Sequence, residues 1–439
     1  MNRGKYNDLL SWKKNPNRKP LVLNGARQVG KSWLLNELGE KEYSKMVYFY
    51  LDRNEDARRV FENGGSAKQL LLSLSALADI DITPNDTLVV LDEIQECPQA
   101  LSALKYFCEE TPDIHIATAG SLLGITMHSG SSFPVGKVDV IQVYPMNFNE
   151  FLQAVGQTKM ASLLDDCDWD AIKALDARFV ELLRLYYYVG GMPAVVKSFA
   201  DENKLIEVRR LQEQILSDYE SDFSKHAPLS EVPKIRMVWQ NIPSQLAKEN
   251  KKFIYGQMKS GARAATFETA IQWLQDSGLA YKIPRTRSIQ MPLKFYEDAN
   301  AFKLFINDIG LLGAMMGVPA APVLTKNTIF TEYKGCFTEV FVCMQLQGID
   351  VPVFYYTEEG SRIEIDFAVQ IGNDVFPVEV KAEDNLQSKS MKTFIGKNPH
   401  LKGIRLSMKP FVDQDWLKCV PLYAFREYFI KQNKEKYSV

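Results

Sequence analysis

An eight-residue segment near the start of the chain has the spacing of a phosphate-binding loop. It matches the pattern GxxxxGK[ST] and lies between an apolar run and a helical pattern. Its glycines allow a turn of positive φ in which successive backbone N–H groups face phosphate oxygens. The expected nucleotide-binding residues are Gly25, Ala26, Arg27, Gln28, Val29, Gly30, Lys31 and Ser32. We expect Lys31 to neutralise the β- and γ-phosphates and the Ser32 hydroxyl to bind Mg²⁺. The alternative is a glycine-rich strand-to-helix turn that binds no ligand.

Two carboxylates follow a second apolar run. Asp92 and Glu93 come directly after four apolar residues, 88–91. Such a run is typical of a buried strand, and in a parallel sheet its end lies at the same edge as the phosphate loop. Asp92 is therefore expected to hold Mg²⁺, and Glu93 to polarise the attacking water as general base. An acidic strand end that caps the next helix is the alternative interpretation.

A third polar element, Thr118–Ser121, ends another expected strand. Its small polar groups come where a sensor of the γ-phosphate would stand, and Ser121 is the candidate residue. Ser121 could equally cap a helix that begins at Leu122. Both interpretations stay open at the level of the sequence.

A second group of carboxylates lies in the last third of the chain. Expected strands over 363–369 and 375–381 carry Asp366, Glu379 and Lys381. Glu379 and Lys381 are two residues apart and share one strand face, and a hairpin would bring Asp366 beside them. Two carboxylates and a lysine at one point can bind Mg²⁺ and polarise a phosphodiester, with Lys381 orienting or activating the water. A solvated hairpin face with a salt bridge is the alternative.

The elements that position these residues follow from hydrophobic periodicity. Short apolar runs alternate with helical patterns in the first third, which predicts a parallel sheet with crossover helices. Residues 149–223 have helical spacing, interrupted at Gly190–Pro193. Residues 231–293 predict three helices and a strand pair, the order of a small winged-helix unit. The expected strands of the first third are 21–24, 46–51, 88–91 and 114–118, and its expected helices are 32–38 and 100–110.

The composition is that of a globular chain with about three domains. The 439 residues are 46% hydrophobic and 24% charged, and 52 Lys and Arg against 54 Asp and Glu give a net charge of −2, which excludes a uniformly basic nucleic-acid-binding chain. Six scattered cysteines and four histidines form neither a disulfide framework nor a zinc-ligand spacing. The N-terminus has no apolar signal-peptide region, and the apolar stretch 309–324 is short and contains prolines. We therefore expect a cytoplasmic protein with reduced cysteines and no membrane partner.

Basic residues are concentrated toward the C-terminus. Residues 381–439 contain twelve Lys and Arg against six Asp and Glu, a local balance of +6. In the expected winged helix, the segment 263–274 offers one arginine and one glutamate and is a poor reader of bases. Cations that flank it could contact phosphates, although solvated helix faces have the same composition. These cations are Lys248, Lys251, Lys252, Lys259, Lys282, Arg285 and Arg287.

In this order the motifs resemble those of prokaryotic AAA-type ATPases in which a C-terminal domain of unknown function follows the P-loop domain. The segments that carry the resemblance are 25–32, 91–95, 119–124, 132–137, 144–151, 190–193, 302–312 and 334–340. The resemblance implies ATP and Mg²⁺ as cofactors and a C-terminal domain similar to restriction-endonuclease folds. There, Ile365-Asp366 and Glu379-Val380-Lys381 resemble the PD-(D/E)xK nuclease motif. That resemblance implies Glu339, on the preceding helix, as an auxiliary metal ligand beside Asp366 and Glu379.

The chain departs from this family at one position that bears on the rate of hydrolysis. Many relatives have a Gly-Arg pair where this chain has Gly136-Lys137. Arginine and lysine are not equivalent at a transferring phosphoryl group, and an arginine finger is worth about 10³ to 10⁵ in rate. Either hydrolysis is slow, or Arg184 or an arginine from a neighbouring subunit serves, the latter requiring a homo-oligomer.

The expected fold class is α/β, with an AAA-like P-loop NTPase core, a helical and winged-helix middle, and a C-terminal α/β restriction-endonuclease-like domain. The expected parts are an ATPase domain at 1–150, a helical lid-like segment at 151–225, a winged helix at 226–295 and a nuclease-like domain at 296–439. The leading hypothesis is an ATPase whose nucleotide state regulates a DNA-engaging, nuclease-like domain. The alternative is a non-catalytic ATP-dependent switch or scaffold for a protein partner, with an inert nuclease fold. A metabolite kinase is disfavoured because no second-substrate pocket can be argued from the sequence.

Overall fold

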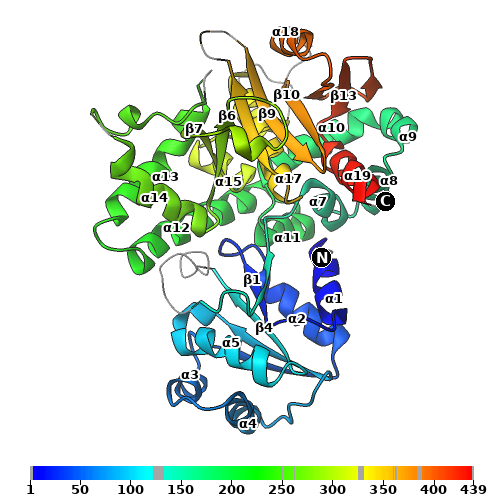
Figure 1. Ribbon diagram of the computed structural model, residues 1–439. Coiled ribbons are helices and arrows are strands. Elements are labelled where there is room, and N and C mark those ends of the chain that lie inside the picture. The colour runs from blue at the N-terminus through cyan, green and yellow to red at the C-terminus, as the bar shows by residue number, and fades with distance from the viewer. Residues whose placement is uncertain are drawn as a thin grey trace. The chain divides into compact units, whose positions relative to one another are not determined.

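The computed structural model describes residues 3–121, 133–248, 251–261, 263–324, 331–358, 360, 363–382 and 388–437. The chain forms two compact units, whose elements are labelled in Figure 1. The N-terminal unit contains Asn2–Pro145 and Asp276–Leu279, and the C-terminal unit contains Met146–Gln275 and Ala280–Val439. The short segment Asp276–Leu279 is thus packed with residues that come far earlier in the chain.

The N-terminal unit is built on a five-stranded parallel sheet with the order β2-β3-β4-β1-β5. Strands β3 (Thr87–Asp92) and β4 (His115–Gly120) are buried along their whole length, and β1 (Leu21–Asn24) is buried except at its end. The edges are β2 (Lys45–Tyr50) and β5 (Asp139–Gln142). Continuous apolar runs are typical of such strands because helices cover both faces. The predicted parallel sheet is confirmed, with β5 as an additional strand.

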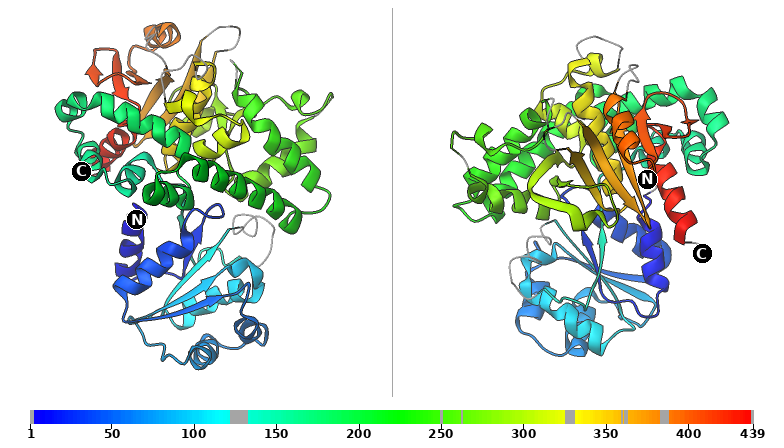
Figure 2. Two further views of the ribbon diagram at one scale, coloured as in Figure 1. Left: turned by 180° about the vertical axis from the view of Figure 1, so that it is seen from behind. Right: turned by 45° about the horizontal axis from the view of Figure 1, so that its top comes forward.

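Helices cover the two faces of this sheet (Figures 1 and 2). Helix α2 (Lys31–Glu42) contacts β2, β3 and β4, and α1 (Tyr6–Lys14) packs on α2. Helices α3 (Glu55–Glu62), α4 (Ala67–Ala78) and α5 (Pro98–Glu110) pack on one another against the opposite face. The sheet is therefore a middle layer, and only the strand ends are accessible for a site.

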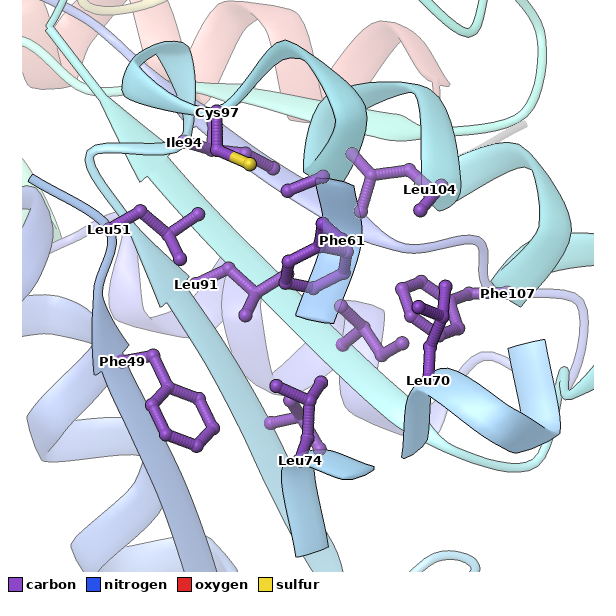
Figure 3. Packing of buried hydrophobic residues seen from close by; sticks show 14 of the residues in the cluster. Phe49, Leu51, Phe61, Leu70, Leu74, Leu91, Ile94, Cys97, Leu104 and Phe107 are labelled. Atoms are coloured by element: carbon purple, nitrogen blue, oxygen red, sulfur yellow. The ribbon is translucent and has the colours of Figure 1, made fainter. Parts of the chain in front are cut away.

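The core between the sheet and α3, α4 and α5 is apolar (Figure 3). Phe49 and Leu91 from the strands meet Phe61, Leu70 and Phe107 from the helices. The rings of Phe61 and Phe107 meet edge to face, with centroids 6.5 Å apart. Burial of a side chain of this size contributes about 1.5–3 kcal/mol. This packing anchors β3, the strand that ends in the two candidate carboxylates.

The C-terminal unit contains an eight-stranded mixed sheet with the order β12-β13-β11-β10-β9-β8-β6-β7. Its strands β9 and β10 form an antiparallel pair, and β10 is parallel to β11. The strands are β6 (Ala280–Thr286), β7 (Glu297–Ile306), β8 (Val353–Thr357), β9 (Glu364–Ile371), β10 (Asp374–Val380), β11 (Gly403–Ser407), β12 (Val412–Asp413) and β13 (Leu417–Pro421).

Strands β6 and β7 join the expected middle part to the last third of the chain. They pair with each other, and β6 also pairs in parallel with β8. The expected boundary between residues 295 and 296 therefore falls between two paired strands of one sheet. Helices α13 (Val232–Leu246) and α14 (Ala264–Asp276) precede this hairpin. That order of elements is the one expected of a winged helix, and the assignment stays a prediction.

Helices form the rest of the C-terminal unit, seen from behind in Figure 2. Helices α10, α12 and α15 pack on one another. No helix in the described ranges has both the length and the apolar character needed to cross a bilayer, and the six cysteines are free thiols. The remaining helices are α7 (Phe148–Ala154), α8 (Thr158–Asp166), α9 (Trp169–Ala174), α10 (Asp176–Val189), α11 (Pro193–Glu202), α12 (Leu205–His226), α15 (Ile309–Met315), α16 (Ala320–Leu324), α17 (Thr331–Gln347), α18 (Lys389–Lys397) and α19 (Phe425–Tyr437).

Two of the segments that carry the family resemblance meet in this unit through Asp308. One carboxylate oxygen accepts a 2.6 Å hydrogen bond from the Gly191 N–H, and the other accepts a 2.9 Å bond from the Leu311 N–H, which caps α15. A Cβ on Gly190, whose φ is +77°, would lie 2.3 Å from Asp308 Oδ1. Burial raises the pKa of Asp308 to about 6. The Gly-Gly pair therefore has a structural role, since it lets the backbone approach a buried carboxylate.

Candidate functional site

The loop between β1 and α2 has the backbone of a phosphate-binding loop. Gly25 has a φ of +147°, and Gly30, with a φ of +94°, is the N-cap of α2. A Cβ on Gly25 would lie 2.1 Å from the Val143 carbonyl oxygen, so a side chain does not fit there. Gln28 also has a positive φ, of +66°. The residues expected to form the loop therefore adopt the left-handed turns that direct N–H groups to one side.

Lys31 is buried within the loop it follows. Its ammonium donates 2.8 Å hydrogen bonds to the carbonyl oxygens of Gly25 and Ala26. Burial lowers the pKa of Lys31 to about 8, although Glu93 and Asp92 act to raise it. These two carboxylates are thus close enough to Lys31 to influence its charge. The charges of Lys31, Asp92 and Glu93 therefore influence one another.

Asp92, the last residue of β3, is buried and held through both carboxylate oxygens. The Tyr48 hydroxyl donates a 2.6 Å hydrogen bond to Oδ2, and the Glu93 N–H donates a 2.9 Å bond to Oδ1. The Ser32 side chain lies near the same Tyr48 phenol, whose pKa is raised by burial and by Asp92. The two expected magnesium ligands, Ser32 and Asp92, therefore lie at the same phenol.

Sequence reasoning missed Tyr48, which lies on the neighbouring strand β2. The register pairs Tyr48 with Val90 and Tyr50 with Asp92. A tyrosine in an apolar strand is ordinarily counted as core, and only the pairing of β2 with β3 brings its hydroxyl to Asp92. The one available signal was the polar hydroxyl of Tyr48, on a strand expected in the same sheet as the strand that ends in Asp92.

Glu93 occupies a strained backbone position. Its φ and ψ are 52° and 45°, in the left-handed region, which is uncommon for a residue with a side chain. Its Oε2 accepts a 2.5 Å hydrogen bond from the Gln95 amide. Backbone strain of this kind costs about 1–3 kcal/mol and is concentrated at functional sites. The carboxylate is therefore held in a set direction at the end of β3.

Fewer contacts are described for Ser121, the candidate γ-phosphate sensor, and for Lys137 and Arg184, the candidate cations. Ser121 is buried directly after β4, which lies between β1 and β3 and so ends at the same sheet edge. The helix expected to begin at Leu122 lies outside the described residues. Lys137 forms an exposed ion pair with Glu109, with Nζ and Oε1 2.8 Å apart. The described contacts of Lys137 are thus with α5, and the role of Arg184, on α10 in the other unit, stays a prediction.

The C-terminal carboxylates lie on one face of the second sheet. Phe367 pairs with Val378, and the adjacent residues Asp366 and Glu379 alternate to the opposite face. Asp366 Oδ2 accepts a 2.8 Å hydrogen bond from the Val380 N–H. Burial and the charge of Glu339 raise the pKa of Asp366 to about 7. The predicted hairpin is present, and it brings Asp366 to the strand that carries Glu379.

Lys381 and Glu379 form an ion pair, with Nζ and Oε1 3.1 Å apart. Glu379 is 4% exposed, and its second oxygen, Oε2, is buried with no hydrogen-bond partner among the described residues. Buried polar atoms are rarely left without a partner. This oxygen can accept an additional cation or proton.

Glu339, the expected third metal ligand, is bound by two lysines instead. Lys251 forms a short ion pair with one oxygen, and Lys303 Nζ lies 3.7 Å from the other and 3.0 Å from Glu364 Oε1. Burial would raise the pKa of Glu339, but the two lysines lower it. Among the residues that the structure describes, no three His, Cys, Asp or Glu side chains are grouped to hold a metal ion. Glu339, Asp366 and Glu379 are therefore not grouped as a three-carboxylate set, and two lysines compensate the charge of Glu339.

Comparison with known families gives a match for the part of the chain that contains the phosphate loop. Residues 17–152 match a family described as the AAA domain. This part of the chain is similar to AAA-type P-loop domains. Residues 180–321 and 334–425 match two families described as domains of unknown function, DUF8612 and DUF4143. No curated protein sequence matches the chain.

Solved structures with a weak likeness to the chain include archaeal ATPases. A Walker-type ATPase of Pyrococcus abyssi is 12% identical over 71% of this chain and 94% of its own, with a TM-score of 0.45. Cdc6p of Pyrobaculum aerophilum is 13% identical over 73% of this chain and 93% of its own, with a TM-score of 0.26. These scores are low, so the AAA assignment depends on the family match and on the loop geometry.

The AAA domain has the donor set that Mg²⁺ and a nucleotide require. Ser32 and Asp92 supply the hydroxyl and carboxylate oxygens that Mg²⁺ prefers, and both lie at the Tyr48 phenol. Because Gly25 has no side chain, the loop backbone lies close to Val143, a position from which a Cβ would displace it. These residues fit the ATP and Mg²⁺ that the family implies.

Proposed function

We propose that the AAA domain binds ATP with Mg²⁺ and hydrolyses it. The observation that carries the proposal is the buried ammonium of Lys31 close to Asp92, whose carboxylate accepts a 2.6 Å hydrogen bond from the Tyr48 phenol near Ser32. When bound, Mg²⁺ neutralises charge on the phosphates. The loop N–H groups and the N-terminus of α2 then orient the triphosphate.

In this proposal each residue of the site has a separate task. Lys31 exchanges the two loop carbonyls for phosphate oxygens and compensates their charge. Asp92 holds the metal, and Glu93 accepts the proton of the attacking water. Ser121, at the end of β4, contacts the γ-phosphate. Gln95 orients the Glu93 carboxylate through the hydrogen bond between them.

Phosphate release from ATP by the full chain tests this proposal. Lys31→Ala is expected to remove both binding and hydrolysis, whereas Glu93→Gln retains binding but loses hydrolysis because an amide cannot accept the proton. Lys41→Ala, at an exposed lysine of the same helix, is the matched control. Unchanged phosphate release in both Lys31→Ala and Glu93→Gln would contradict the proposal.

We further propose that nucleotide state regulates a nucleic-acid-engaging, nuclease-like C-terminal unit. Support comes from the common face of Asp366 and Glu379, from the unpartnered Glu379 Oε2, and from the basic balance of 381–439. The test is nicking of plasmid DNA with Mg²⁺ or Mn²⁺, in the presence of ATP, ADP or no nucleotide. Nicking that depends on the nucleotide and is lost in Asp366→Ala is the expected result.

An inert nuclease fold within an ATP-dependent switch or scaffold for a protein partner is the second candidate. It is favoured by the ion pairs of Lys251 and Lys303 with Glu339, which supply positive charge where a metal would. Under this alternative, no nicking occurs in any nucleotide state although ATP is still hydrolysed or bound. The plasmid assay therefore decides between the two.

A further inference from the structure

A cavity of about 540 Å³ lies at the carboxyl ends of two neighbouring strands of the C-terminal sheet. Strands β6 and β8 run parallel there, and Thr286 is paired with Tyr356. A volume of this size is that of a small-ligand site, and the carboxyl ends of parallel strands are where ligands bind in α/β sheets. The described residues that line it are Arg285, Arg287, Tyr356, Thr357 and Glu358.

One buried carboxylate orients both arginines. Asp298, on β7, is paired with Arg285 and accepts its Nε at 2.9 Å and its Nη2 at 2.6 Å. Arg287 Nη2 lies 3.8 Å from the other oxygen of Asp298. Arg285 Nη1 also lies 3.5 Å from the Thr357 hydroxyl oxygen. The two guanidinium groups are therefore held beside each other at one wall of the cavity.

Among the described side chains around the cavity, cations outnumber carboxylates. Glu358 is bound by Lys397, whose Nζ lies 2.7 and 2.9 Å from its two oxygens. Asp298 is shared between two arginines, and the side chain of Arg287 is 67% exposed. Adjacent guanidinium groups present paired N–H donors that match phosphate oxygens. The chemistry of the cavity thus favours a ligand that carries a phosphate group.

The cavity borders the face that carries the candidate nuclease residues. Thr357, which lines the cavity, is paired with Glu364, and Glu364 and Asp366 alternate to one face of β9. A phosphate held by the arginines would therefore lie at the margin of the carboxylate cluster. A single strand of nucleic acid carries phosphates at regular intervals and could occupy both places at once.

We propose that Arg285 and Arg287 form a phosphate-binding site that takes a backbone phosphate of a nucleic-acid strand. This inference rests on the proposed engagement of nucleic acid by the C-terminal unit. The strand is positioned by the arginines, which read no base, and its adjoining phosphodiester is presented to Asp366 and Glu379. Arginine contacts of this kind position a strand without giving sequence specificity.

Fluorescence anisotropy of a labelled single-stranded oligodeoxynucleotide with the full chain tests the site. Arg287→Ala is expected to weaken binding about tenfold, the value for loss of a hydrogen bond to a charged group. The slope of log K against log salt should fall by about 0.7 for the lost phosphate contact. Arg287→Lys should recover the slope but not the full affinity, because lysine keeps the charge without the planar fork.

A matched control is available in the same unit. Arg210, on α12, is 63% exposed and ion-paired with Glu207, so Arg210→Ala removes a comparable surface charge away from the cavity. Thermal unfolding of each variant establishes that the fold is retained. Equal loss of binding in Arg210→Ala and Arg287→Ala would overturn the site, since it would show a general charge effect.

The outcomes separate this inference from the proposed function. If the unchanged chain binds the oligonucleotide and Arg287→Ala binds it equally well, the arginine site is overturned while nucleic-acid engagement stands. If the unchanged chain does not bind it, nucleic-acid engagement is overturned. Pyrophosphate then decides the arginine site: a thermal shift reduced in Arg287→Ala supports a phosphate site for a small ligand, and an equal shift overturns it.

Discussion

The hydroxyl of Tyr48 donates a 2.6 Å hydrogen bond to Asp92, the carboxylate at the end of β3. The same tyrosine lies near Ser32 at the start of α2. Two residues that are expected to bind Mg²⁺, from different elements, therefore lie at one phenol from the neighbouring strand, which holds Asp92 directly. We interpret Tyr48 as a positioning residue that sets the distance between the loop and β3.

Tyr48→Phe should weaken the binding of Mg²⁺ with ATP, because Asp92 Oδ2 loses the hydrogen bond that directs it. The loss of a hydrogen bond to a charged group predicts about a tenfold rise in the Mg²⁺ concentration needed for half-saturation. The measurement is a Mg²⁺ titration of the binding of a fluorescent ATP analogue. Tyr50→Phe is the control, since Tyr50 is exposed and its ring lies beside that of Tyr48, tilted by 41° at a centroid distance of 4.7 Å. Tighter Mg²⁺ binding in Tyr48→Phe would mean that the phenol competes with the metal instead.

Gly25→Ala should unfold the phosphate loop. A Cβ at this position would lie 2.1 Å from a backbone carbonyl oxygen, and a backbone atom cannot move aside as a flexible side chain can. We expect a loss of about 3 kcal/mol in the free energy of unfolding, together with loss of ATP binding. Gly64→Ala is the control, because Gly64 also has a positive φ but no atom within 4 Å of its Cβ position. That control should lose only about 1 kcal/mol. Similar urea midpoints for the two variants would refute the steric argument.

Gly278→Ala should reduce ATP affinity through the backbone of the loop. Gly278 belongs to the segment that packs with the N-terminal unit, and its Cβ position lies 2.9 Å from the Ala26 nitrogen. Ala26 is part of the phosphate loop, so an added methyl group displaces an atom of the binding site. Gly156→Ala has a comparable φ, +79° against +72°, with open space around it. Titration with a fluorescent ATP analogue should show weaker binding for Gly278→Ala alone, and equal affinities in both variants would count against this role.

The stability of the chain should depend on pH through Asp366. Its pKa is raised from 3.8 to about 7 in the folded protein, first by burial and then by Glu339. Between about pH 4 and pH 7 the folded state therefore binds more protons than the unfolded state, and stability falls as the pH rises. Asp366→Asn should lose this dependence and gain stability relative to the unchanged chain above pH 7.

Urea unfolding at pH 5 and pH 8 measures the effect as a difference between the two proteins. Asp415→Asn, at an exposed carboxylate of the same unit, serves as the control and should follow the unchanged chain. If Asp366→Asn shows the same pH dependence as the unchanged chain, then Asp366 is ionised in the folded state at pH 5.

The P-loop site was accessible from the sequence because its information is local. Gly25, Gly30 and Lys31 are close together in the chain, and their backbone preferences determine the turn and the start of α2. The apolar run before Asp92 likewise predicts a buried strand that ends in a carboxylate. A periodic pattern of this kind predicts the elements of a parallel sheet without knowledge of their neighbours.

Other features depended on pairing between distant segments. The contact of Tyr48 with Asp92 follows from the register of β2 on β3, and the ion pairs of Glu339 follow from the positions of Lys251 and Lys303. The joining of β6 and β7 to the C-terminal sheet has the same origin. Motif residues and element types are thus readable along the chain, since short-range sterics and periodicity encode them. The partners of those residues are not, because strand register and burial depend on the free energy of the whole packed unit.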